Sequence, residues 1–412
     1  MAAGITVRPV QGRRDRAAFI DFPYRHYADD PYFVAPLRMD VKKLLNPNKN
    51  AFFEHGQIQT FLARDEAGAV VGRIAAIING MHLKKYEDGV GFFGFFETID
   101  SADVADALLG AADSWLLDQG MTAMRGPCNP SLNDTAGLLM DGFESPPFVM
   151  MTHNPKYYCT LLEEAGFKRE MTLWAYYIHR KYAKVEKVRR GVNLIKRRYP
   201  GLTLRTLDMK RFKEEAATIR EIFNEGWSEN WGHVPMTEAE FDHLASEMKQ
   251  IIDPRMAYML ELDGETVAFC ISIPNMNQAL APLRNGRLLP FGIFKLLPKV
   301  LFSGIQEVRL PLLGVRKAYH GRGFDALMIL ETVDRVPPLG YPGCEMSWIL
   351  DNNLPMRNAL ESLGGVKHKE YAIVQRAIAQ QTIAQPATPQ HAIAQPAGAG
   401  AASEEAAPTG HE

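Results

Sequence analysis

An apolar run, a turn with two glycines and the start of a helix follow one another between residues 308 and 331. Residues 308–315 predict a buried strand, and residues 326–331 predict the first turns of a helix. Gly321 and Gly323 lie between them, where glycine lets the backbone come close to a ligand. The unpaired amides at a helix start attract anions. The segment therefore predicts a phosphate-binding turn, although such a turn also occurs in structures that bind nothing there.

The chain carries one plan twice. Residues 60–77 and residues 258–273 each contain an apolar run, a turn with an acidic residue and glycine, and a second apolar run. This is the pattern of a β-hairpin. A second pattern, in which Leu-Glu follows an asparagine after eight residues and glycine follows after twelve, begins at Asn154 and again at Asn352. Matching offsets in the same order indicate a tandem duplication.

Strand and helix patterns occur in both copies, so we expect an α/β fold with a mixed sheet in each. The first domain is expected over residues 1–182, a basic linker helix over residues 183–201, and a second domain over residues 202–376. Residues 377–412 are rich in Ala, Gln, Pro and Gly and contain no aromatic residue, Lys or Arg. Such a segment buries too little apolar area to offset its ordering entropy, so we expect a disordered tail.

Composition excludes several classes of function. The formal net charge of -2 argues against a nucleic-acid partner. The four cysteines are far apart in the sequence and form no Cys-x-x-Cys pair, so neither a metal site nor a disulfide framework is expected. The sequence near Met1 carries several charges and has no long apolar core, and no run of about 18 apolar residues occurs. We therefore expect a cytoplasmic protein.

The second half resembles the GNAT N-acyltransferase superfamily, whose acyl-CoA loop has the pattern Arg or Gln, two residues, Gly, one residue, and Gly or Ala. His320, Gly323 and Asp325 occupy these three positions, so only the glycine matches. The resemblance implies acyl-CoA as a co-substrate rather than a tightly bound cofactor. It also implies that the donor is held by residues of the long strand, of the loop and of the closing segment, namely Leu313, Gly314, Val315, His320, Gly321, Arg322, Gly323, Phe324 and Asn352.

The first half resembles the same fold without its acyl-CoA loop, because residues 101–104 contain no glycine where the loop is expected. The family's usual acid is a tyrosine four residues before the closing glycine, and Leu360 stands there in this chain. Either Tyr371 or Tyr319 protonates the leaving thiolate instead, or the thiolate leaves unassisted.

Residues 224–235 are the most unusual stretch of the second half, with two tryptophans, two glutamates and a histidine. A carboxylate beside tryptophan is expected to have a raised pKa and to act as a base, so Glu229 is the first candidate. His233 and Glu307 follow it. Trp227 and Trp231 are expected to line the acceptor side. The alternative is a structural loop whose tryptophans close the core.

Residues 284–302 form a basic and strongly apolar insertion that includes Phe291. One interpretation is an element that lies on a membrane surface, with Phe291 near a lipid substrate. The other is a buried helix whose lysines extend to water. In the first half, His55 is a candidate for a pocket between the halves, although such a histidine is also commonly structural.

Three segments carry a closer resemblance to long bacterial tandem-GNAT proteins, and among these to the bacterial ceramide synthases: Phe-Ile-Asp-Phe-Pro-Tyr-Arg at 19–25, Asn-Trp-Gly-His-Val-Pro at 230–235 and Gly-Arg-Leu-Leu-Pro-Phe-Gly at 286–292. The resemblance implies transfer of an acyl group from a thioester to the amine of a sphingoid base. An acyl carrier protein could replace coenzyme A. The alternatives are N-acetylation of a small soluble amine and a non-catalytic binding protein on a decayed scaffold.

Overall fold

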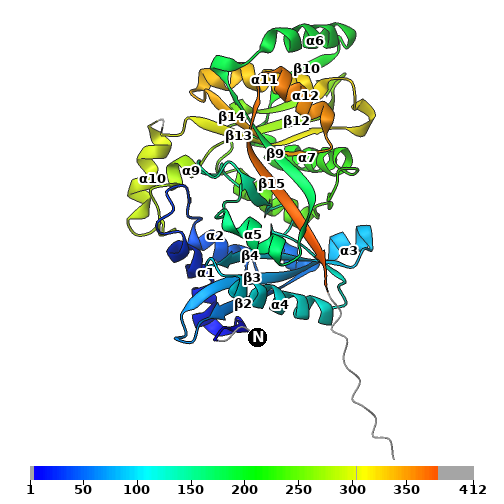
Figure 1. Cartoon of the computed structure of the whole chain (residues 1–412). Helices are drawn as coiled ribbons and strands as arrows, with labels where there is room; N and C mark the ends of the chain where they lie inside the picture. Colours follow the sequence, from blue (N-terminus) through cyan, green and yellow to red (C-terminus); the bar gives the residue numbers. More distant parts are fainter. Residues whose placement is uncertain (1–3, 303, 379–412) are drawn as a thin grey trace, which may run out of the picture. The chain divides into compact units, whose positions relative to one another are not determined.

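The computed structural model describes residues 4–302 and 304–378, which contain two successive sets of strands and helices (Figure 1). The first set consists of β1 (Thr6–Pro9), α1 (Gly12–His26), α2 (Arg38–Leu44), η1 (Ala51–Glu54), β2 (Gly56–Arg64), β3 (Val70–Asn79), α3 (Gly80–Tyr86), β4 (Val90–Thr98), α4 (Ala102–Asp118), β5 (Ala123–Gly126), β6 (Cys128–Asn129), β7 (Thr135–Ala136), β8 (Leu138–Asp141), α5 (Tyr157–Glu164), β9 (Lys168–His179) and η2 (Arg180–Tyr182).

The second set consists of α6 (Val185–Arg198), β10 (Leu202–Thr206), η3 (Met209–Arg211), α7 (Phe212–Gly226), α8 (Glu238–Met248), η4 (Pro254–Met256), β11 (Ala257–Leu262), β12 (Glu265–Pro274), α9 (Asn277–Leu280), α10 (Gly292–Leu301), β13 (Glu307–Val315), η5 (Lys317–Tyr319), α11 (Phe324–Arg335), η6 (Pro337–Leu339), β14 (Gly343–Leu350), α12 (Leu354–Ser362) and β15 (Val366–Ala377). The predicted strand, turn and helix near residue 320 are confirmed as β13, η5 and α11. A helix, α6, also forms where the sequence predicts the linker.

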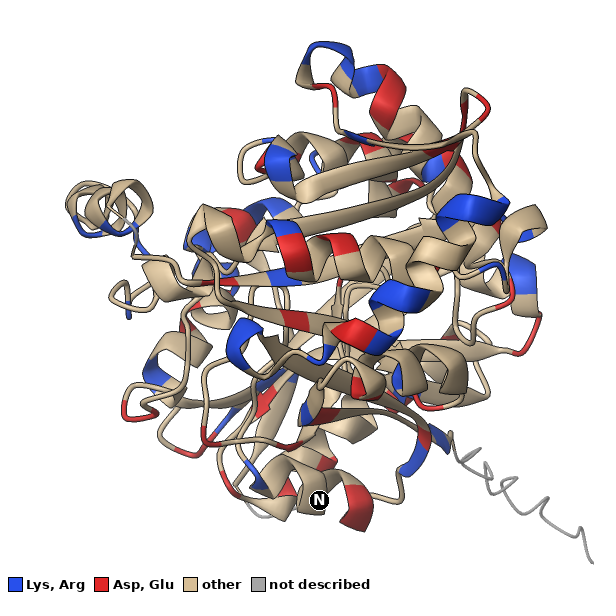
Figure 2. Cartoon of the chain, turned by 90° about the horizontal axis from the view of Figure 1, so that it is seen from above, with Lys and Arg blue, Asp and Glu red and all other residues tan. Residues whose placement is uncertain are grey.

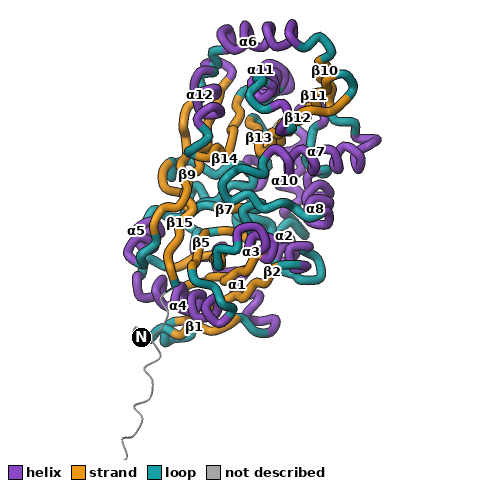
Figure 3. Tube along the Cα trace, turned by 90° about the vertical axis from the view of Figure 1, so that its right-hand side faces the viewer, coloured by secondary structure: helices purple, strands orange, loops and turns teal. Residues whose placement is uncertain are grey.

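One mixed sheet contains strands from both sets. Its order is β1-β2-β3-β4-β5-β15-β9-β14-β13-β12-β11-β10, with β8 paired to β15 beside this path, while β6 and β7 pair with each other. Both predicted hairpins are confirmed, as β2–β3 and β11–β12. Figure 3 shows the two sets following one another along the sheet, with α4 beside the first set and α6 beside the second. The mixed α/β fold with two related halves is therefore confirmed.

The halves exchange their last strands. β15 comes from the end of the second half, yet Val374 pairs with Gly126 of β5 in the first half. In return, β9 of the first half pairs with β14 of the second, where Met346 lies opposite Tyr176. β15 and β9 also pair with each other along most of their length. The backbone hydrogen bonds of the sheet therefore cross the sequence boundary near residues 182–202, and each half depends on the other for the neighbour of its innermost strand.

Helices cover both faces of this sheet. In the first half α4 packs Leu108 on one face, while α1 packs Phe19 on the other. β3 alternates between these two clusters, since Ile74 and Ala76 face α4 while Ala75 and Ile77 face α1. Burial on both faces explains why this strand is a continuous apolar run. In the second half the same arrangement places α11 on one face and α7 on the other.

The chain leaves the sheet at Ile378. The sequence predicts a tail from residue 377, but Ala377 is the last residue of β15 and Ile378 is buried, because β15 extends along β5 as far as Ala123. The remainder of the predicted tail, residues 379–412, lies outside the described residues. Within the described residues, none of the helices combines the length and the apolar character needed to cross a membrane.

Candidate functional site

A fork opens in the sheet between β13 and β14. The two strands pair in parallel only from Glu307 opposite Gly343 to Leu310 opposite Met346. Beyond this point β13 continues along β12, while β14 continues along β9, where Ile349 lies opposite Trp174. The later residues of β13 therefore have a neighbouring strand on one side only. Their backbone groups on the other side have no strand partner.

The register of β13 shows which amides face the fork. The Arg316 N–H, just after the end of β13, donates a hydrogen bond of 2.8 Å to the carbonyl oxygen of Val267 in β12. Backbone groups alternate in direction along a strand, so Gly314 also directs its amide to β12. The expectation that the Gly314 amide faces a donor is therefore wrong. Its lack of a side chain has another cause, because a Cβ would lie 2.5 Å from the ring of Phe269.

Leu313 and Val315 direct their backbone groups into the fork. The Leu313 carbonyl oxygen accepts a hydrogen bond of 3.0 Å from Nε1 of Trp227. The Val315 carbonyl oxygen lies 2.9 Å from Nε2 of His320, which donates to it. Because the N–H and C=O of one strand residue point the same way, the amides of Leu313 and Val315 also face the fork. Of the three amides predicted to bind the donor, those of Leu313 and Val315 thus face the fork, and their contact with a donor stays a prediction.

A cavity of about 410 Å³, here called the fork cavity, lies between these strands and the turn. Its walls include Leu313, Val315, Tyr319, His320, Gly321, Phe324 and Asn352. Of the predicted donor-binding residues, Gly314, Arg322 and Gly323 do not line it. Arg322 instead lies over the ring of Tyr319, 4.9 Å from its centroid. Six of the nine residues predicted to bind the donor thus line this cavity, and donor binding itself stays a prediction.

The two glycines of the turn have different surroundings. Both have positive φ, 72° at Gly321 and 79° at Gly323, which disfavours any side chain there. Gly323 is the N-cap of α11, and a Cβ on it would lie 2.6 Å from Cδ1 of Ile195. A Cβ on Gly321 would meet nothing within 4 Å, so this side of the turn is open. Asp325 in the first turn of α11 also lines the fork cavity and departs from the usual small residue.

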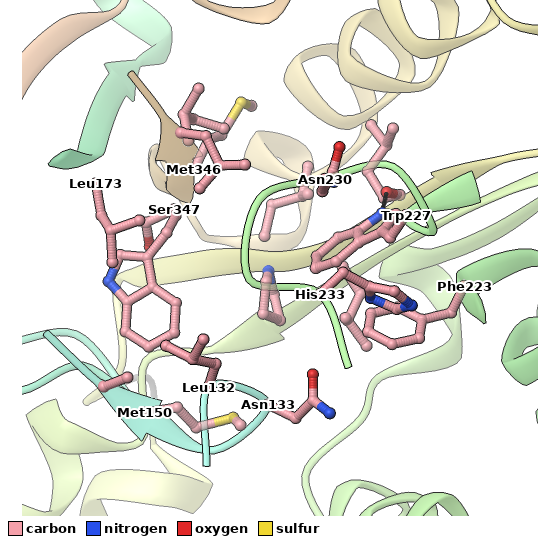
Figure 4. Close-up of a pocket in the computed structure, with 18 of the residues that line it drawn as sticks. Leu132, Asn133, Met150, Leu173, Phe223, Trp227, Asn230, His233, Met346 and Ser347 are labelled. Atoms are coloured by element: carbon pink, nitrogen blue, oxygen red, sulfur yellow. Dashed lines mark hydrogen bonds between the residues drawn. The ribbon is translucent and has the colours of Figure 1, made fainter. Parts of the chain in front are cut away.

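A second cavity, of about 230 Å³, is mostly apolar and lies between residues of both halves. Figure 4 shows Leu173, Met346 and Ser347 on one side, Leu132, Asn133 and Met150 below, and Phe223, Trp227, Asn230 and His233 opposite. This apolar cavity shares walls with the fork cavity, namely Trp227, Asn230, Trp231, Leu313, Leu350, Asn353 and Met356. Trp227 and Trp231 thus line both cavities, and their contact with a substrate stays a prediction.

His233 lies in the wall of the apolar cavity. Its side chain is 6% exposed, and neither ring nitrogen has a hydrogen-bond partner in the described structure. Burial, with a smaller effect of Lys85, lowers the pKa of His233 to about 4. The imidazole is therefore neutral at pH 7 and can accept a proton.

The first half holds the loop that carries His233. The Lys85 ammonium and the Tyr86 hydroxyl both donate to the carbonyl oxygen of His233, over 2.8 Å and 3.0 Å. The Asn133 amide donates to the next carbonyl oxygen, that of Val234, over 3.0 Å. Three side chains of the first half thus hold the backbone at this histidine and at the residue after it. A third cavity, of about 260 Å³, opens beside them and shares Asn230 and Trp231 with the other two.

Asp134 is a site residue that the sequence did not reveal. It lines the apolar cavity and accepts a hydrogen bond of 2.7 Å from the Ser131 hydroxyl. Burial raises the pKa of Asp134 to about 7, and this effect exceeds the lowering by Ser131. The carboxyl group therefore titrates near neutral pH. The only sequence signal was its position in a Pro-Ser-Leu-Asn-Asp turn, and that pattern does not by itself indicate a cavity.

Glu229 does not fulfil its prediction. The carboxylate is solvent-exposed and pairs with the Lys317 ammonium, and this interaction lowers its pKa instead of raising it. The expected neighbouring tryptophans turn inward, while Glu229 points to water at the edge of the fork cavity and of the third cavity. The prediction of a carboxylate with a raised pKa in this loop is therefore wrong, because the ion pair replaces the expected burial.

Four other candidates lie away from the three cavities. Glu307 accepts hydrogen bonds of 2.9 Å from the Tyr177 hydroxyl and from Gln278. Tyr371 is fully buried, and burial raises its pKa well above the usual value. His55 lies 2.9 Å from Glu240 across the boundary between the halves. Phe291 is 76% exposed. These positions favour structural roles for the first three residues and a surface role for Phe291.

The expected tyrosine acid is absent at Leu360, which is fully buried and forms part of the wall of the apolar cavity. Tyr319, the other tyrosine candidate, does line the fork cavity. A stacked contact with Phe324, at 5.8 Å between ring centroids, orients it. Among the predicted acids, Tyr319 is therefore the one that lies beside the open strand edge.

A buried polar cluster sits where the fork begins. The Arg309 Nε donates 2.9 Å to the Ser347 hydroxyl, which donates 2.7 Å to the Glu345 carboxylate. The other Glu345 oxygen lies 2.6 Å from Nε2 of His368. Burial lowers the pKa of Arg309 to about 10, so it stays charged at neutral pH. The cluster joins β13, β14 and β15 at the point where the strands diverge, and it satisfies charges that would otherwise be costly to bury.

Comparison with known proteins identifies the family. The chain is 38% identical over 382 residues to "Bacterial ceramide synthase" of Caulobacter vibrioides, covering 91% of this chain and 98% of that protein. It is 36% identical over 377 residues to "Protein YghO" of Escherichia coli, covering 90% and 95%. The fold matches a solved tandem GNAT protein from the clavulanic acid biosynthesis pathway, with a TM-score of 0.55, 11% identity and coverage of 91% and 99%. No protein-family model matches the chain. The chain belongs to the bacterial ceramide synthase family, and it is an N-acyltransferase of the tandem GNAT type.

Proposed function

We propose that this enzyme transfers a fatty acyl group from acyl-CoA to the amine of a long-chain sphingoid base. The observation that carries the proposal is the connection between the fork cavity and the apolar cavity through shared walls at Trp227, Trp231 and Leu313. The reaction needs a polar space for a thioester donor and an adjoining apolar space for a lipid chain. The name of the Caulobacter relative supports a lipid amine as the acceptor.

The amides of Leu313 and Val315 are the proposed donor contacts. In the fork they would bind the pantetheine arm and the thioester carbonyl oxygen of acyl-CoA. An amide directed at the developing oxyanion typically stabilises such a transition state by about 3 kcal/mol. The pyrophosphate would lie at the start of α11, where the open side of Gly321 leaves the backbone accessible.

His233 is the proposed proton acceptor. The free amine nitrogen attacks the thioester carbon and forms a C–N bond, which makes the attached nitrogen strongly acidic. A neutral imidazole in an apolar cavity can take this proton, and the low pKa of His233 keeps it neutral before the reaction. The C–S bond then breaks and releases coenzyme A as a thiolate. Tyr319 is the proposed donor of the proton that neutralises this thiolate, since it lines the fork cavity.

Asp134 has a separate proposed role in binding the acceptor. A long-chain amine is mostly an ammonium ion in water at pH 7, like a lysine side chain. The ionised Asp134 carboxylate offers it a partner inside the apolar cavity. Because burial disfavours two charged groups, the ammonium can pass a proton to Asp134, which leaves the neutral amine that attacks. Asp134 and His233 line the same cavity, so the amine can pass from binding to reaction without leaving it.

We propose that the enzyme works in the cytoplasm, where it meets its acceptor at a lipid surface. The four cysteines, Cys128, Cys159, Cys270 and Cys344, are all free, which supports a reducing compartment.

The test is incubation of the purified protein with sphinganine and a panel of acyl-CoA chain lengths, with amide products identified by mass spectrometry. We expect an N-acyl sphinganine with a fatty acyl-CoA and little product with acetyl-CoA. A parallel arm uses the same acyl chain on acyl carrier protein, and faster turnover there would reassign the donor. Turnover of acetyl-CoA with soluble amines but not with sphinganine would overturn the proposed acceptor. The His233→Gln variant, with His243→Gln as a control on the exposed side of α8, tests the proton acceptor.

A further inference from the structure

Large apolar side chains gather on one exposed segment of the second half. Residues 289–302 contain Leu289, Phe291, Phe294, Leu301 and Phe302, each at least 65% exposed. Leu297 and Val300 are 43% exposed. Among the residues of α10, only Gly292 is buried. The sequence interpretation of this insertion as a buried helix is therefore wrong, because α10 projects from the sheet instead of packing beneath another element (Figure 1).

Exposure extends round most of α10, since residues 297–301 are all exposed, and large apolar side chains share one face of it. Phe294, Leu297 and Leu301 are spaced three and four positions apart, so they share a face of the helix, and Phe291 precedes them on the same face. Ile293 and Leu296 are partly buried and belong to the side nearer the protein. α10 is therefore apolar both toward the protein and toward solvent. An exposed apolar surface of this kind on a water-soluble fold marks an interaction site.

The charged residues of the segment are all positive. Between residues 276 and 306 the sequence contains Arg284, Arg287, Lys295 and Lys299 but no Asp or Glu. The helix projecting at the left of Figure 2 carries blue positions and no red ones. Lys295 and Lys299 are both exposed and lie four positions apart, so they form one border of the exposed apolar face. Because the whole chain has a net charge of -2, this local excess of positive charge is specific to the segment.

The base of the segment is firmly attached to the first half. The Arg284 guanidinium donates to the carbonyl oxygens of Phe33 and Asp30, over 3.1 Å and 2.6 Å. The Arg38 N–H donates 2.9 Å to the Gly286 carbonyl oxygen. A Cβ on Gly286, whose φ is 63°, would lie 2.3 Å from the ring of Tyr24, so the backbone packs directly on this ring. The segment is thus anchored at its start and exposed along α10.

We propose that residues 287–302 dock the enzyme on the surface of an anionic lipid bilayer. The exposed phenylalanine and leucine side chains would enter the boundary between headgroups and acyl chains, and Arg287, Lys295 and Lys299 would contact the lipid phosphates. The combination of an apolar face with a lysine border matches a bilayer surface better than a protein groove, since no acidic residue is present to fix the partner's register. The docking itself does not depend on the proposed function. Only its benefit does, since a docked enzyme would reach an amine dissolved in the membrane.

Vesicle binding by the full chain tests the docking surface. Purified protein is mixed with phosphatidylcholine vesicles, with or without phosphatidylglycerol, and the bound fraction is measured by sedimentation. We expect binding to the anionic vesicles only. Replacing Lys295 and Lys299 by Gln is expected to lower the partition coefficient about fivefold per lysine, because a basic residue near an anionic surface contributes about 1 kcal/mol. The variant with Phe291→Ser, Phe294→Ser and Leu301→Ser is expected to lose binding.

A matched control separates specific binding through α10 from non-specific binding through any exposed leucine. Leu194 is 64% exposed on the strongly basic helix α6, so Leu194→Ser removes an exposed leucine beside many positive charges. This variant is expected to bind vesicles like the unmodified chain. Equal losses in both variants would overturn the assignment to α10. Circular dichroism and turnover with a detergent-soluble short-chain amine are expected to stay unchanged in the α10 variants, which shows that they fold.

The same samples exclude other occupants of this face. If the unmodified chain fails to bind vesicles but is dimeric in analytical ultracentrifugation, and the triple variant is monomeric, a second copy covers α10 and the proposal is overturned. If only a chain ending at Ile378 binds vesicles, residues 379–412 cover it, which also overturns the proposal. Vesicle binding needs neither acyl-CoA nor amine. Retained binding without ceramide formation would therefore contradict the proposed function alone.

Discussion

The indole Nε1 of Trp227 donates a hydrogen bond of 3.0 Å to the carbonyl oxygen of Leu313. This contact joins the end of α7 to the open edge of β13, and both residues form walls of the fork cavity and of the apolar cavity. Trp227, which the sequence assigns to the acceptor side with core closure as the alternative, thus contacts the strand edge on which donor binding is proposed. The first prediction tests this contact.

Trp227→Phe keeps an aromatic ring and removes the donor. A hydrogen bond of this kind typically contributes about 1 kcal/mol, so kcat/KM for acyl-CoA is expected to fall about fivefold. Trp174→Phe is the control, because the Trp174 indole donates 2.8 Å to Asp351 outside the three cavities. Steady-state kinetics on both variants make the comparison, and equal effects would show that the Leu313 contact has no special role.

Gly323→Ala introduces a side chain at a φ of 79° and within 2.6 Å of Ile195. We expect a loss of about 1–2 kcal/mol in stability from the left-handed backbone and a raised KM for acyl-CoA, because the start of α11 must shift. Gly340→Ala meets the same backbone restriction, at a φ of 101°, but no neighbour within 4 Å. It should lose similar stability without a change in KM. A normal KM for Gly323→Ala would contradict the proposed pyrophosphate position.

His233 makes the stability of the protein sensitive to acid. Its pKa is about 4 in the folded state and near 6.5 when unfolded, so the unfolded chain binds a proton first as the pH falls. Above pH 6.5 His233 is neutral in both states and does not change the free energy of unfolding. From pH 6.5 to pH 4 the free energy of unfolding decreases by about 3 kcal/mol. Urea denaturation at pH 7 and at pH 4.5 measures the decrease. The decrease is expected to be smaller in His233→Gln, and an unchanged decrease would assign it to other groups.

Asp134 is expected to make kcat/KM for the amine depend on pH near neutrality, which appears as a rising limb in the pH profile. Because its pKa is raised to about 7, the carboxylate needed to bind an ammonium group forms only as the pH passes that value. We expect kcat/KM for the amine to rise through pH 7 in the unmodified enzyme. In Asp134→Asn the limb is absent and KM for the amine is raised, while KM for acyl-CoA is unchanged. A limb that persists in Asp134→Asn would exclude this carboxyl group as its source.

The exchanged strands predict a single unfolding unit. A chain that ends after Gly365 lacks β15 and leaves β5 and β9 without a neighbour they share. We expect it to lose cooperative unfolding in both halves, whereas a chain that ends at Ile378 keeps the melting temperature of the full protein. Differential scanning calorimetry on the two truncations provides the measurement. Two separate transitions in the full-length chain would contradict the shared sheet.

Part of the site could be predicted because it is local in sequence. The strand, the glycine turn and the helix near His320 follow one another within about 25 residues, and their apolar spacing and glycines report backbone geometry directly. The same holds for Trp227, Trp231 and His233, which one loop carries into a single cavity wall. Glu229 belongs to that loop but turns outward to Lys317, and no periodic pattern indicates the direction of a loop side chain.

The sequence alone thus determined the two related α/β halves, the position of the glycine turn and the tryptophan loop, because each depends on residues close together along the chain. Only the tertiary structure decided which groups share a cavity. Asp134 lines the same cavity as His233 because the two halves fold against each other, and Lys85 and Tyr86 hold the His233 carbonyl from about 150 residues away. The exchange of β9 and β15 was equally invisible, since backbone hydrogen bonds between strands carry no side-chain signature. Burial, and with it the pKa of each candidate group, arises only when these distant segments meet.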